Sequence, residues 1–403
     1  TGPAGRCVMI IAGEASGDLH AANLIRHMRE QVNGPLFFCG IGGDAMRRAG
    51  AKILVEASRL SVVGITEVIA RLPDILSGMK AAKRMLASRV PDLLVLIDFP
   101  DFNLRMAGVA RQYGIPVFYY IPPQVWAWRK GRVRTIQRRV DHTAVILPFE
   151  ADFFKEHGVP VTFVGHPLMD AGYDRFPEKI KEAGKMVVGL LPGSRNGEVS
   201  RHLPVMMEAA ALIGRNHPDV SFLVSCAASI PEERLTAITD RYAGTVPFAL
   251  LSGGVEQVLA RSDCVVAVSG TVTLETALCG VPMVVIYRVS LLSYWLAKIL
   301  IRLKSISLVN LIAGREIVPE LIQGDVSAEN IAARVEAMIT DPPTMQAVQE
   351  ALAEVRGRLG GPGASARAAR IAAQLLTGRD NDKNHLPAAN LRPPCEARPD
   401  GNV

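Results

Sequence analysis

Short apolar runs recur along the whole chain, and a stretch with helical periodicity follows most of them. The runs, rich in valine, isoleucine and leucine, predict strands at 7–12, 36–40, 92–97, 116–121, 143–147, 161–164, 186–191, 220–225, 263–268 and 282–286. The stretches between them predict helices that include 18–32, 74–89, 102–113, 200–216 and 271–279. Continuously apolar strands that alternate with helices are typical of parallel sheets covered on both faces. The pattern therefore predicts an α/β fold of the doubly wound type.

The alternation breaks in one place, at 166–184, HPLMDAGYDRFPEKIKEAG, which is rich in charged residues and contains two prolines and two glycines. A chain of 403 residues is also too long for one ordinary core. We predict two Rossmann-like domains, at 1–170 and 171–344, with the helices at about 345–377 packing back on the first and a disordered tail at 378–403. Two such domains are expected to face each other across a cleft at the carboxyl ends of their strands, where this class of sheet binds ligands.

Charge adds a second feature, because the net charge is +6 and the stretch 129–139, RKGRVRTIQRR, holds six basic residues and no acid. Such a patch attracts nucleic acid, anionic lipid or phosphorylated small molecules, and its sign does not choose among them. The six cysteines lack CxxC spacing, and no HExxH occurs, which argues against a zinc site or a disulfide frame. No apolar run reaches the roughly 18 residues that a membrane span needs.

Two turns in the first half carry candidate chemistry. In AGEASGD, 12–18, a strand meets a glycine and then Glu14, Ser16 and Asp18 at the start of a helix, where free N–H groups can hold an anion. The simpler explanation is that Ser16 or Asp18 caps the helix. The spacing GxGxxG is absent, so a dinucleotide site is not indicated. The turn GIGGDAM at 40–46 is best explained as a plain strand-to-helix loop.

The segment IDFPDFN, 97–103, ends a buried strand in two carboxylates, Asp98 and Asp101, on either side of Pro100 and followed by Asn103. A turn with a helix cap explains the pair, and so does a catalytic carboxylate at the carboxyl end of a strand. The residues alone leave both explanations open.

Two turns in the second half suit phosphate. In LLPGSRNGEV, 190–199, the backbone of Gly193, the hydroxyl of Ser194 and the guanidinium of Arg195 converge before a helix that begins near residue 196. In SGTVTLE, 269–275, a helix begins at Ser269, Gly270 and Thr271, and Glu275 lies one turn further on, where it can accept hydrogen bonds from ribose. Each turn alone could be a capped helix, but two in one domain favour a nucleotide. The Walker A pattern is missing, which counts against a P-loop ATPase.

Two further segments combine aromatic and basic or apolar residues. Trp126, Trp128 and Arg129 lie in PQVWAWR, 123–129, beside the basic stretch, which suits single-stranded nucleic acid or a phosphorylated or membrane-bound substrate. No RNA-binding signature accompanies them. The segment 290–305, SLLSYWLAKILIRLKS, predicts either a buried helix or one that lies in a membrane interface. His166, in VGHP, is best explained as a structural histidine.

The chain resembles lipid-A-disaccharide synthases, a family of glycosyltransferases of outer-membrane lipopolysaccharide assembly. The motifs that carry the resemblance occur in order and span about residues 8–323: AGEASGD, GITEV (64–68), IDFPDFN, PQVWAWR, LPFE (147–150), VGHP (164–167), LPGSR (191–195), SGTVTLE, NLIAGRE (310–316) and ELIQ (320–323). Only PQVWAWR and LPGSR are distinctive individually, but the ordered set is specific.

The resemblance implies a GT-B fold and an inverting, metal-independent transfer without a cofactor. The implied substrates are UDP-2,3-diacylglucosamine and 2,3-diacylglucosamine 1-phosphate, which give a β-1′,6-linked disaccharide 1-phosphate and UDP. The acceptor would bind the first domain and the nucleotide-sugar the second. The resemblance also implies that the protein is held peripherally on the cytoplasmic surface of the inner membrane. It implies no nucleic-acid partner. A homodimer is left open.

The resemblance also distributes roles. Asp98 becomes the candidate general base, with Glu14 and His20 as rivals, and Asp101 the cap that supports it. The nucleotide-sugar site is expected at Gly193, Ser194, Arg195, Ser269, Gly270, Thr271, Glu275, Asn310 and Gln323. Acceptor binding or structural support is expected from Ser16, Asp18, Asp101, Asn103, Trp126, Trp128, Arg129 and His166. Two alternatives remain: another GT-B enzyme, such as a UDP-N-acetylglucosamine epimerase or a peptidoglycan glycosyltransferase, and a basic nucleic-acid-binding or membrane-binding module.

Overall fold

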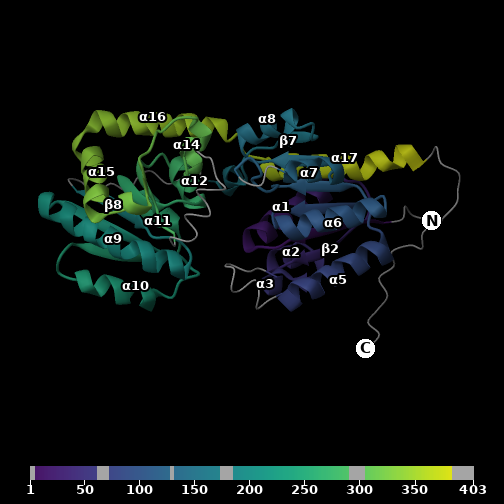
Figure 1. Ribbon diagram of the computed structural model, residues 1–403, viewed down its shortest axis with the longest axis horizontal. Helices are drawn as coiled ribbons and strands as arrows, with labels where there is room; N and C mark the ends of the chain where they lie inside the picture. Colours follow the sequence, from purple (N-terminus) through teal and green to yellow (C-terminus); the bar gives the residue numbers. More distant parts are fainter. Residues whose placement is uncertain (1–4, 61–71, 128–130, 173–184, 290–304, 384–403) are drawn as a thin grey trace. The chain divides into compact units, whose positions relative to one another are not determined.

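The computed structural model describes residues 5–60, 72–127, 131–172, 185–289 and 305–383. The motif at 64–68, the residues Trp128 and Arg129, and the apolar segment up to residue 304 lie outside the described residues. The chain forms two compact units (Figure 1). The N-terminal unit comprises Thr1–Asp170 and Gly361–Val403, and the C-terminal unit comprises Ala171–Gly360.

The N-terminal unit is built on a parallel sheet whose described strands run in the order β3-β2-β1-β4-β5-β6-β7. The strands are β1 Arg6–Ala12, β2 Leu36–Gly42, β3 Ala51–Glu56, β4 Leu93–Ile97, β5 Val117–Tyr120, β6 His142–Val145 and β7 Val161–Phe163. The helices are α1 Ala15–Gln31, α2 Asp44–Arg48, α3 Ala57–Leu60, α5 Leu72–Arg89, α6 Pro100–Gln112, α7 Arg132–Arg139, α8 Pro148–Glu156 and α17 Ala364–Lys383, with a 3-10 turn, η1, at Pro167–Ala171. The chain order reverses between β1 and β4, which makes their carboxyl ends the switch point of the sheet.

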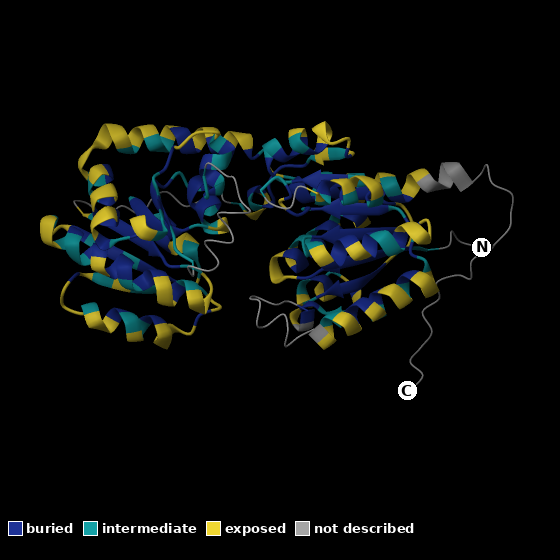
Figure 2. Ribbon diagram, viewed as in Figure 1, coloured by how far each residue is buried: buried dark blue, intermediate teal, exposed yellow. Residues whose placement is uncertain are grey.

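The central strands of this sheet, such as β1 and β4, are buried on both faces, because successive side chains point to opposite sides and both sides are covered. Val8 and Ile10 of β1 pack in one cluster with α1 and with the alanines of α17. Met9 and Ile11 pack in a second cluster with α5, α6, α7 and α8. The unbroken apolar strands of the sequence therefore reflect two cores, one on each face. In Figure 2 the central strands are mostly coloured as buried.

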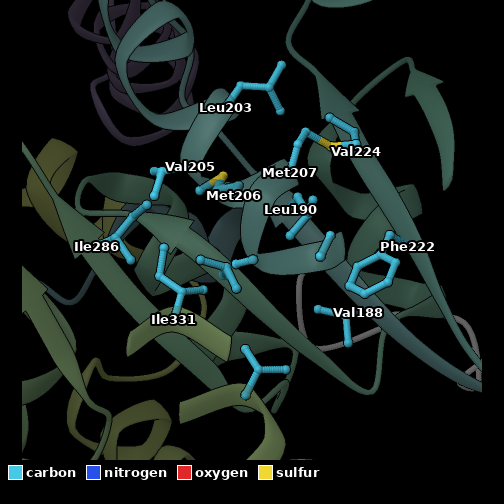
Figure 3. Close-up of a cluster of buried hydrophobic side chains, with 14 of the residues drawn as sticks. Val188, Leu190, Leu203, Val205, Met206, Met207, Phe222, Val224, Ile286 and Ile331 are labelled. Carbon is cyan, nitrogen blue, oxygen red and sulfur yellow. The ribbon is translucent and has the colours of Figure 1, made fainter. Parts of the chain in front are cut away.

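The C-terminal unit repeats the plan, with described strands in the order β10-β9-β8-β11-β12-β13, again all parallel. The strands are β8 Met186–Leu191, β9 Val220–Cys226, β10 Phe248–Ser252, β11 Cys264–Val268, β12 Met283–Tyr287 and β13 Glu320–Ile322. The helices are α9 Asn196–Asn216, α10 Glu232–Thr239, α11 Val255–Arg261, α12 Thr271–Leu278, α14 Leu308–Ala313, α15 Ala328–Thr340 and α16 Pro342–Arg358, with 3-10 turns η3 at Asp240–Tyr242 and η4 at Gln323–Asp325. In the core, Val188 and Phe222 of the sheet pack with Met206 of α9 and Ile331 of α15 (Figure 3).

The prediction of doubly wound parallel sheets is confirmed, and every strand predicted from an apolar run is present. The sequence patterns missed three strands, β3, β10 and β13, and each is the outermost strand at one edge of its sheet. Edge strands are exposed along one side and so lack the continuous apolar run of central strands. Helix α1 begins at Ala15, earlier than the apolar pattern predicted, because its first turn consists of small and polar residues. Helix α9 begins at Asn196, as the turn at 190–199 predicted, although its apolar pattern starts only at 200.

The helices after residue 327 divide between the units. Helix α16 packs against α12, α14 and α15 of the C-terminal unit, whereas α17, yellow in Figure 1, packs against α1 of the N-terminal unit. The return to the N-terminal unit thus begins at Gly361 rather than at about 345. Helix α17 also continues to Lys383, so the predicted tail does not begin at Gly378, and residues 384–403 lie outside the description.

Candidate active site

Asp98 and Glu14 follow neighbouring strands at the switch point of the N-terminal sheet. Asp98 comes directly after β4, and Glu14 follows β1 after a single glycine and occupies the N-cap position of α1. Ligands of doubly wound sheets bind where such strands end. The structure therefore brings the preferred base and one of its rivals to the same edge of the sheet.

The backbone at Asp98 is held in an unusual conformation. Asp98 and Phe99 both have positive φ angles, 47° and 48°, which non-glycine residues rarely adopt. The amide of Asn103 donates hydrogen bonds to the carbonyls of Ile97 (3.1 Å) and Asp98 (2.6 Å), and the hydroxyl of Tyr119 also donates to the carbonyl of Asp98 (2.8 Å). Backbone strain of this kind is characteristic of functional sites, where surrounding contacts hold it in place.

The turn after β1 and the turn after β4 interlock. A Cβ atom at Gly13 would lie only 2.3 Å from the ring of Phe99, so the ring occupies the space that any larger residue at position 13 would need. Phe99 also stacks on Phe102, with ring centroids 5.0 Å apart. Glycine at position 13 thus lets the turn after β4 pack directly against the turn after β1.

Asp98 has the electrostatic character of a base that works near neutral pH. Burial, followed by the negative charge of Glu14, raises the pKa of its carboxyl to about 6, against the lowering effect of a hydrogen bond from the Phe99 backbone. A general base is most effective when its pKa lies near the working pH. Burial and the neighbouring Glu14 thus bring the pKa of Asp98 close to that value.

Asp101 does not cap helix α6, so that prediction is wrong. The N-cap position is Phe99, and Pro100 begins the helix. The carboxylate of Asp101 is exposed and pairs with the guanidinium of Arg132 in α7. The support that we predicted from Asp101 comes instead from Asn103, whose buried amide binds the two carbonyls at the end of β4.

His20 and His166 belong to a second cluster, around Asp170. Burial lowers the pKa of each imidazole to about 4, so both are neutral at pH 7. The Nδ1 atom of His166 accepts a hydrogen bond from the N–H of Leu168 (3.2 Å), which gives it a structural role. A His20 imidazole with so low a pKa is a weak base, which favours Asp98 over this rival.

Asp18 links two motifs that the sequence kept apart. It does not cap its own helix, whose N-cap is Glu14. Its buried carboxylate accepts N–H hydrogen bonds from Gly43 (2.7 Å), Ala45 (2.8 Å) and Met46 (3.1 Å), and so caps α2 in the GIGGDAM turn. That turn is the predicted strand-to-helix loop. Ser16 is exposed in the first turn of α1.

Trp126 is tied to the LPFE motif. Its indole N–H donates to the buried carboxylate of Glu150 (2.9 Å), and its ring meets that of Phe149 edge-on. Burial raises the pKa of Glu150 to about 7, against the lowering effect of this hydrogen bond. Part of the basic stretch is also used internally, because Arg139 of α7 donates to the carbonyl of Leu104 (2.8 Å).

The loop Gly193–Arg195 lies between β8 and α9, as predicted. Gly193 has a φ of 106°, and the following residues are exposed. The N–H groups of Ser194 (3.1 Å) and Arg195 (3.3 Å) donate to one carboxylate oxygen of Glu198, and the Arg195 guanidinium donates to the other (3.1 Å). The Arg195 guanidinium, which we predicted for a phosphate, and two backbone N–H groups of the same loop therefore already hold an anionic group.

The second predicted phosphate turn lies between β11 and α12. Gly270 is the N-cap of α12, and a Cβ atom built there meets no atom of the described residues within 4 Å, so this part of the chain leaves the space before the helix open. The Ser269 hydroxyl donates to the carbonyl of Ile306 (3.4 Å), while Thr271 is exposed. Glu275 is half-buried one turn into the helix. The N–H groups that begin α12 can accept a phosphate in this open space.

Asn310 and Gln323 have their amides engaged within the protein. Asn310 is buried; its Nδ2 donates to Val318 O (2.9 Å) and Glu320 (2.7 Å), and its Oδ1 accepts from two backbone N–H groups. All its hydrogen-bonding capacity is used, so we reassign it to structural support. The Gln323 amide pairs with the backbone of Val289, accepting at 2.7 Å and donating at 3.2 Å.

Sequence reasoning missed several residues that organise these sites. Tyr119 and Glu198 are described above. His202 links α9 to the residue that follows β12, with Nδ1 donating to the Glu198 carbonyl (2.8 Å) and Nε2 accepting from the Arg288 N–H (3.0 Å). Glu198 could have been found, because a glutamate three residues after a helix N-cap is a known signature. Tyr119 and His202 carry no such signal, since their partners are distant in sequence.

Among the described residues, no group of three or more histidine, cysteine, aspartate or glutamate side chains is suited to hold a metal ion. None of the helices in the described ranges is long and apolar enough to cross a membrane.

Comparisons with known proteins extend over almost the whole chain. A family profile described as Lipid-A-disaccharide synthetase matches residues 8–374. A lipid-A-disaccharide synthase of Geobacter sulfurreducens is 45% identical over 375 residues, which cover 92% of this chain and 97% of that protein. One from Syntrophus aciditrophicus is 46% identical and covers 93% of this chain and 99% of its own length.

Solved structures with the same fold are distant in sequence. A UDP-GlcNAc 2-epimerase of Neisseria meningitidis, solved with UDP-GlcNAc, superposes with a TM-score of 0.59 at 11% identity, covering 92% of this chain and all of that one. The glycotransferase of kitacinnamycin superposes with a TM-score of 0.60 at 17% identity, covering 93% and 99%. The expected GT-B fold is thereby confirmed.

Proposed function

The chain belongs to the lipid-A-disaccharide synthase family, and on this premise we propose that it joins UDP-2,3-diacylglucosamine to 2,3-diacylglucosamine 1-phosphate. The family acts in lipid A biosynthesis. The proposed products are the β-1′,6-linked disaccharide 1-phosphate and UDP. The transfer is inverting and needs no metal, and the enzyme works peripherally on the cytoplasmic face of the inner membrane.

The observation that carries the proposed mechanism is the carboxylate at the switch point, Asp98, half-buried and close enough to the charge of Glu14 to have a pKa of about 6. The 6-hydroxyl oxygen of the acceptor attacks the anomeric carbon of the donor on the face opposite UDP. The C–O bond to the diphosphate breaks, UDP leaves with the electron pair, and Asp98 takes the hydroxyl proton. The configuration at the anomeric carbon is inverted in this single displacement.

The C-terminal unit is proposed to hold the departing UDP. Negative charge grows on the diphosphate as the bond breaks, so stabilisation by fixed donors lowers the barrier. We assign this role to the backbone of Ser194 and Arg195, the Arg195 guanidinium and the start of α12 at Thr271. Glu275 is assigned to the ribose hydroxyls. The open space at Gly270 and the exposure of Arg195 support this assignment.

The proposal is tested with purified protein and both acylated substrates, by measuring disaccharide formation and UDP release. The Asp98→Asn variant should lower kcat by about a hundredfold or more, because a neutral amide cannot take the proton. Its Kd for UDP should stay close to the wild-type value. Wild-type protein that forms no disaccharide, or that instead converts unacylated UDP-N-acetylglucosamine, would contradict the proposed function. An Asp98→Asn variant that keeps its turnover would move the base to another residue.

A further inference from the structure

A carboxylate of the protein itself occupies the donors that the proposed function gives to the diphosphate. Glu198, in the first turn of α9, accepts hydrogen bonds from the N–H groups of Ser194 (3.1 Å) and Arg195 (3.3 Å) on its Oε2 atom. Its Oε1 atom accepts from Nη1 of Arg195 (3.1 Å). One anionic group therefore binds three donors at the place where an anionic ligand is expected.

The loop is shaped around this carboxylate. A Cβ atom at Gly193 would lie 2.5 Å from Oε2 of Glu198, so glycine is needed for the carboxylate to sit there. On the other side, the Ser229 hydroxyl donates to the carbonyl of Ser194 (2.7 Å), which helps to fix the peptide group whose N–H, that of Arg195, points to Glu198. The loop is held ready for an anion while its own carboxylate fills the position.

A carboxylate and a phosphate cannot both bind these donors. A backbone N–H carries one proton and makes one strong hydrogen bond, and two anionic groups at this spacing repel each other. We propose that Glu198 is a positioning residue that exchanges with the diphosphate. It organises the empty loop, leaves the Ser194 and Arg195 N–H groups when UDP or the UDP-sugar binds, and returns when UDP departs. This inference rests on the proposed function.

Exchange has a measurable consequence that ordinary helix capping does not. A glutamate at this position of a helix often accepts the N-cap N–H and only stabilises the helix. Capping alone predicts that Glu198→Gln costs some stability and leaves nucleotide affinity unchanged or weaker. Exchange predicts the opposite for affinity, because the neutral amide competes less strongly with the diphosphate and does not repel it.

The test measures the binding of UDP and of uridine, by calorimetry, to wild-type protein and to Glu198→Gln. UDP should bind the variant about five- to tenfold more tightly, the effect of one weakened charged contact. Uridine, which lacks phosphate, should bind both proteins equally. In the full reaction, kcat and the KM for the UDP-sugar should fall together, because UDP leaves more slowly. Glu233→Gln, which removes the same charge from an exposed position in the neighbouring α10, should match wild type.

Two results would overturn the exchange. One is a Glu198→Gln variant with unchanged or weaker UDP affinity, and the other is a structure of the wild-type UDP complex in which Glu198 still accepts both N–H groups. The structure of the UDP complex decides the matter if the Glu198→Gln variant fails to fold.

The Arg195→Ala variant separates this inference from the proposed function. If it weakens UDP binding while Glu198→Gln does not strengthen it, only the exchange fails. If it has no effect on UDP, the diphosphate assignment fails and the exchange with it.

Discussion

At the scale of single residues, environment sets the chemistry of Asp98. Sequence position made it one of two neighbouring carboxylates, and the fold separates them. Asp101 is exposed and pairs with Arg132, whereas Asp98 is half-buried and feels the charge of Glu14. Burial and a like charge both disfavour the ionised form, so the pKa of Asp98 rises to about 6 while the carboxyl can still ionise at neutral pH.

This electrostatic arrangement predicts the pH dependence of the enzyme. Asp98 accepts a proton only when ionised, so kcat/KM should fall as the pH drops through about 6, the pKa of Asp98. Glu14→Gln removes the charge that helps to raise this pKa, so the fall of kcat/KM on the acid side, the acid limb, should move down by about half a pH unit to one unit.

The measurement is a pH–rate profile of each protein. Asp74→Asn, an exposed acid in the first turn of α5, serves as the control and should leave the limb in place. An acid limb that does not move in Glu14→Gln would show that Asp98 and Glu14 are not coupled in solution.

At the scale of elements, the turns at the carboxyl ends of the strands depend on one another. Asp18 of α1 caps α2, and Phe99 of the β4–α6 turn fills the space beside Gly13 of the β1–α1 turn. The switch point is therefore a single packed assembly of turns from separate parts of the chain.

Gly13→Ala tests this interlocking. The added methyl group would meet the Phe99 ring at 2.3 Å, so the two turns must separate or the ring must move. We expect the free energy of unfolding to fall by about 2 kcal/mol, typical of overpacking, and kcat to fall because Asp98 is displaced. Urea denaturation and steady-state kinetics provide the measurements. Gly357→Ala in α16, where a Cβ atom meets nothing within 4 Å, is the control and should be neutral or slightly stabilising. Equal stability of Gly13→Ala and wild type would refute the interlocking.

At the scale of the whole molecule, the chain leaves the N-terminal unit at Asp170 and returns at Gly361. Hydrogen bonds within the N-terminal unit hold together the segment that leaves it and the segment that returns to it. The Asp170 carboxylate accepts N–H hydrogen bonds from Gly363 (2.6 Å), Ala364 (3.0 Å) and Ser365 (3.0 Å), and so caps α17. The Arg367 guanidinium donates to the carbonyls of Val164, Gly361 and Pro362.

Loss of this cap should weaken one unit and spare the other. Asp170→Ala should lower the stability of the N-terminal unit by about 1–2 kcal/mol, seen as faster hydrogen exchange in α1 and α17. UDP binding should not change, because its proposed residues lie in the C-terminal unit with a separate core. Asp152→Ala, an exposed acid of α8, is the control.

The same cap has a pH signature. Hydrogen bonds from the backbone of residues 363–365 outweigh burial and lower the pKa of Asp170 below its ordinary 3.8. Its contribution to stability is therefore fully present above about pH 4 and is lost as the pH falls through the lowered pKa. The difference between wild type and Asp170→Ala should shrink in acid. A difference that stays constant down to pH 2 would contradict the assignment.

Local pattern by itself determined much about this protein. Continuous apolar runs that alternate with helical apolar patterns specified two parallel sheets, because buried central strands must be apolar on both faces. The glycine turns marked where strands end, and ordered motifs identified the family. Edge strands such as β10 escaped the pattern because they are only partly buried.

Only the tertiary structure decided what each side chain does within those turns. It gave the cap of α2 to Asp18, the support of Asp98 to Asn103 and Tyr119, and the donors of the Gly193–Arg195 loop to Glu198. The tertiary structure also gave every donor and acceptor of the Asn310 amide a partner within the protein, and it raised the pKa of Asp98. Sequence spacing specifies where a strand ends. Hydrogen-bond partners and desolvation depend on residues that meet only when distant parts of the chain fold together, and these set the chemistry of each group.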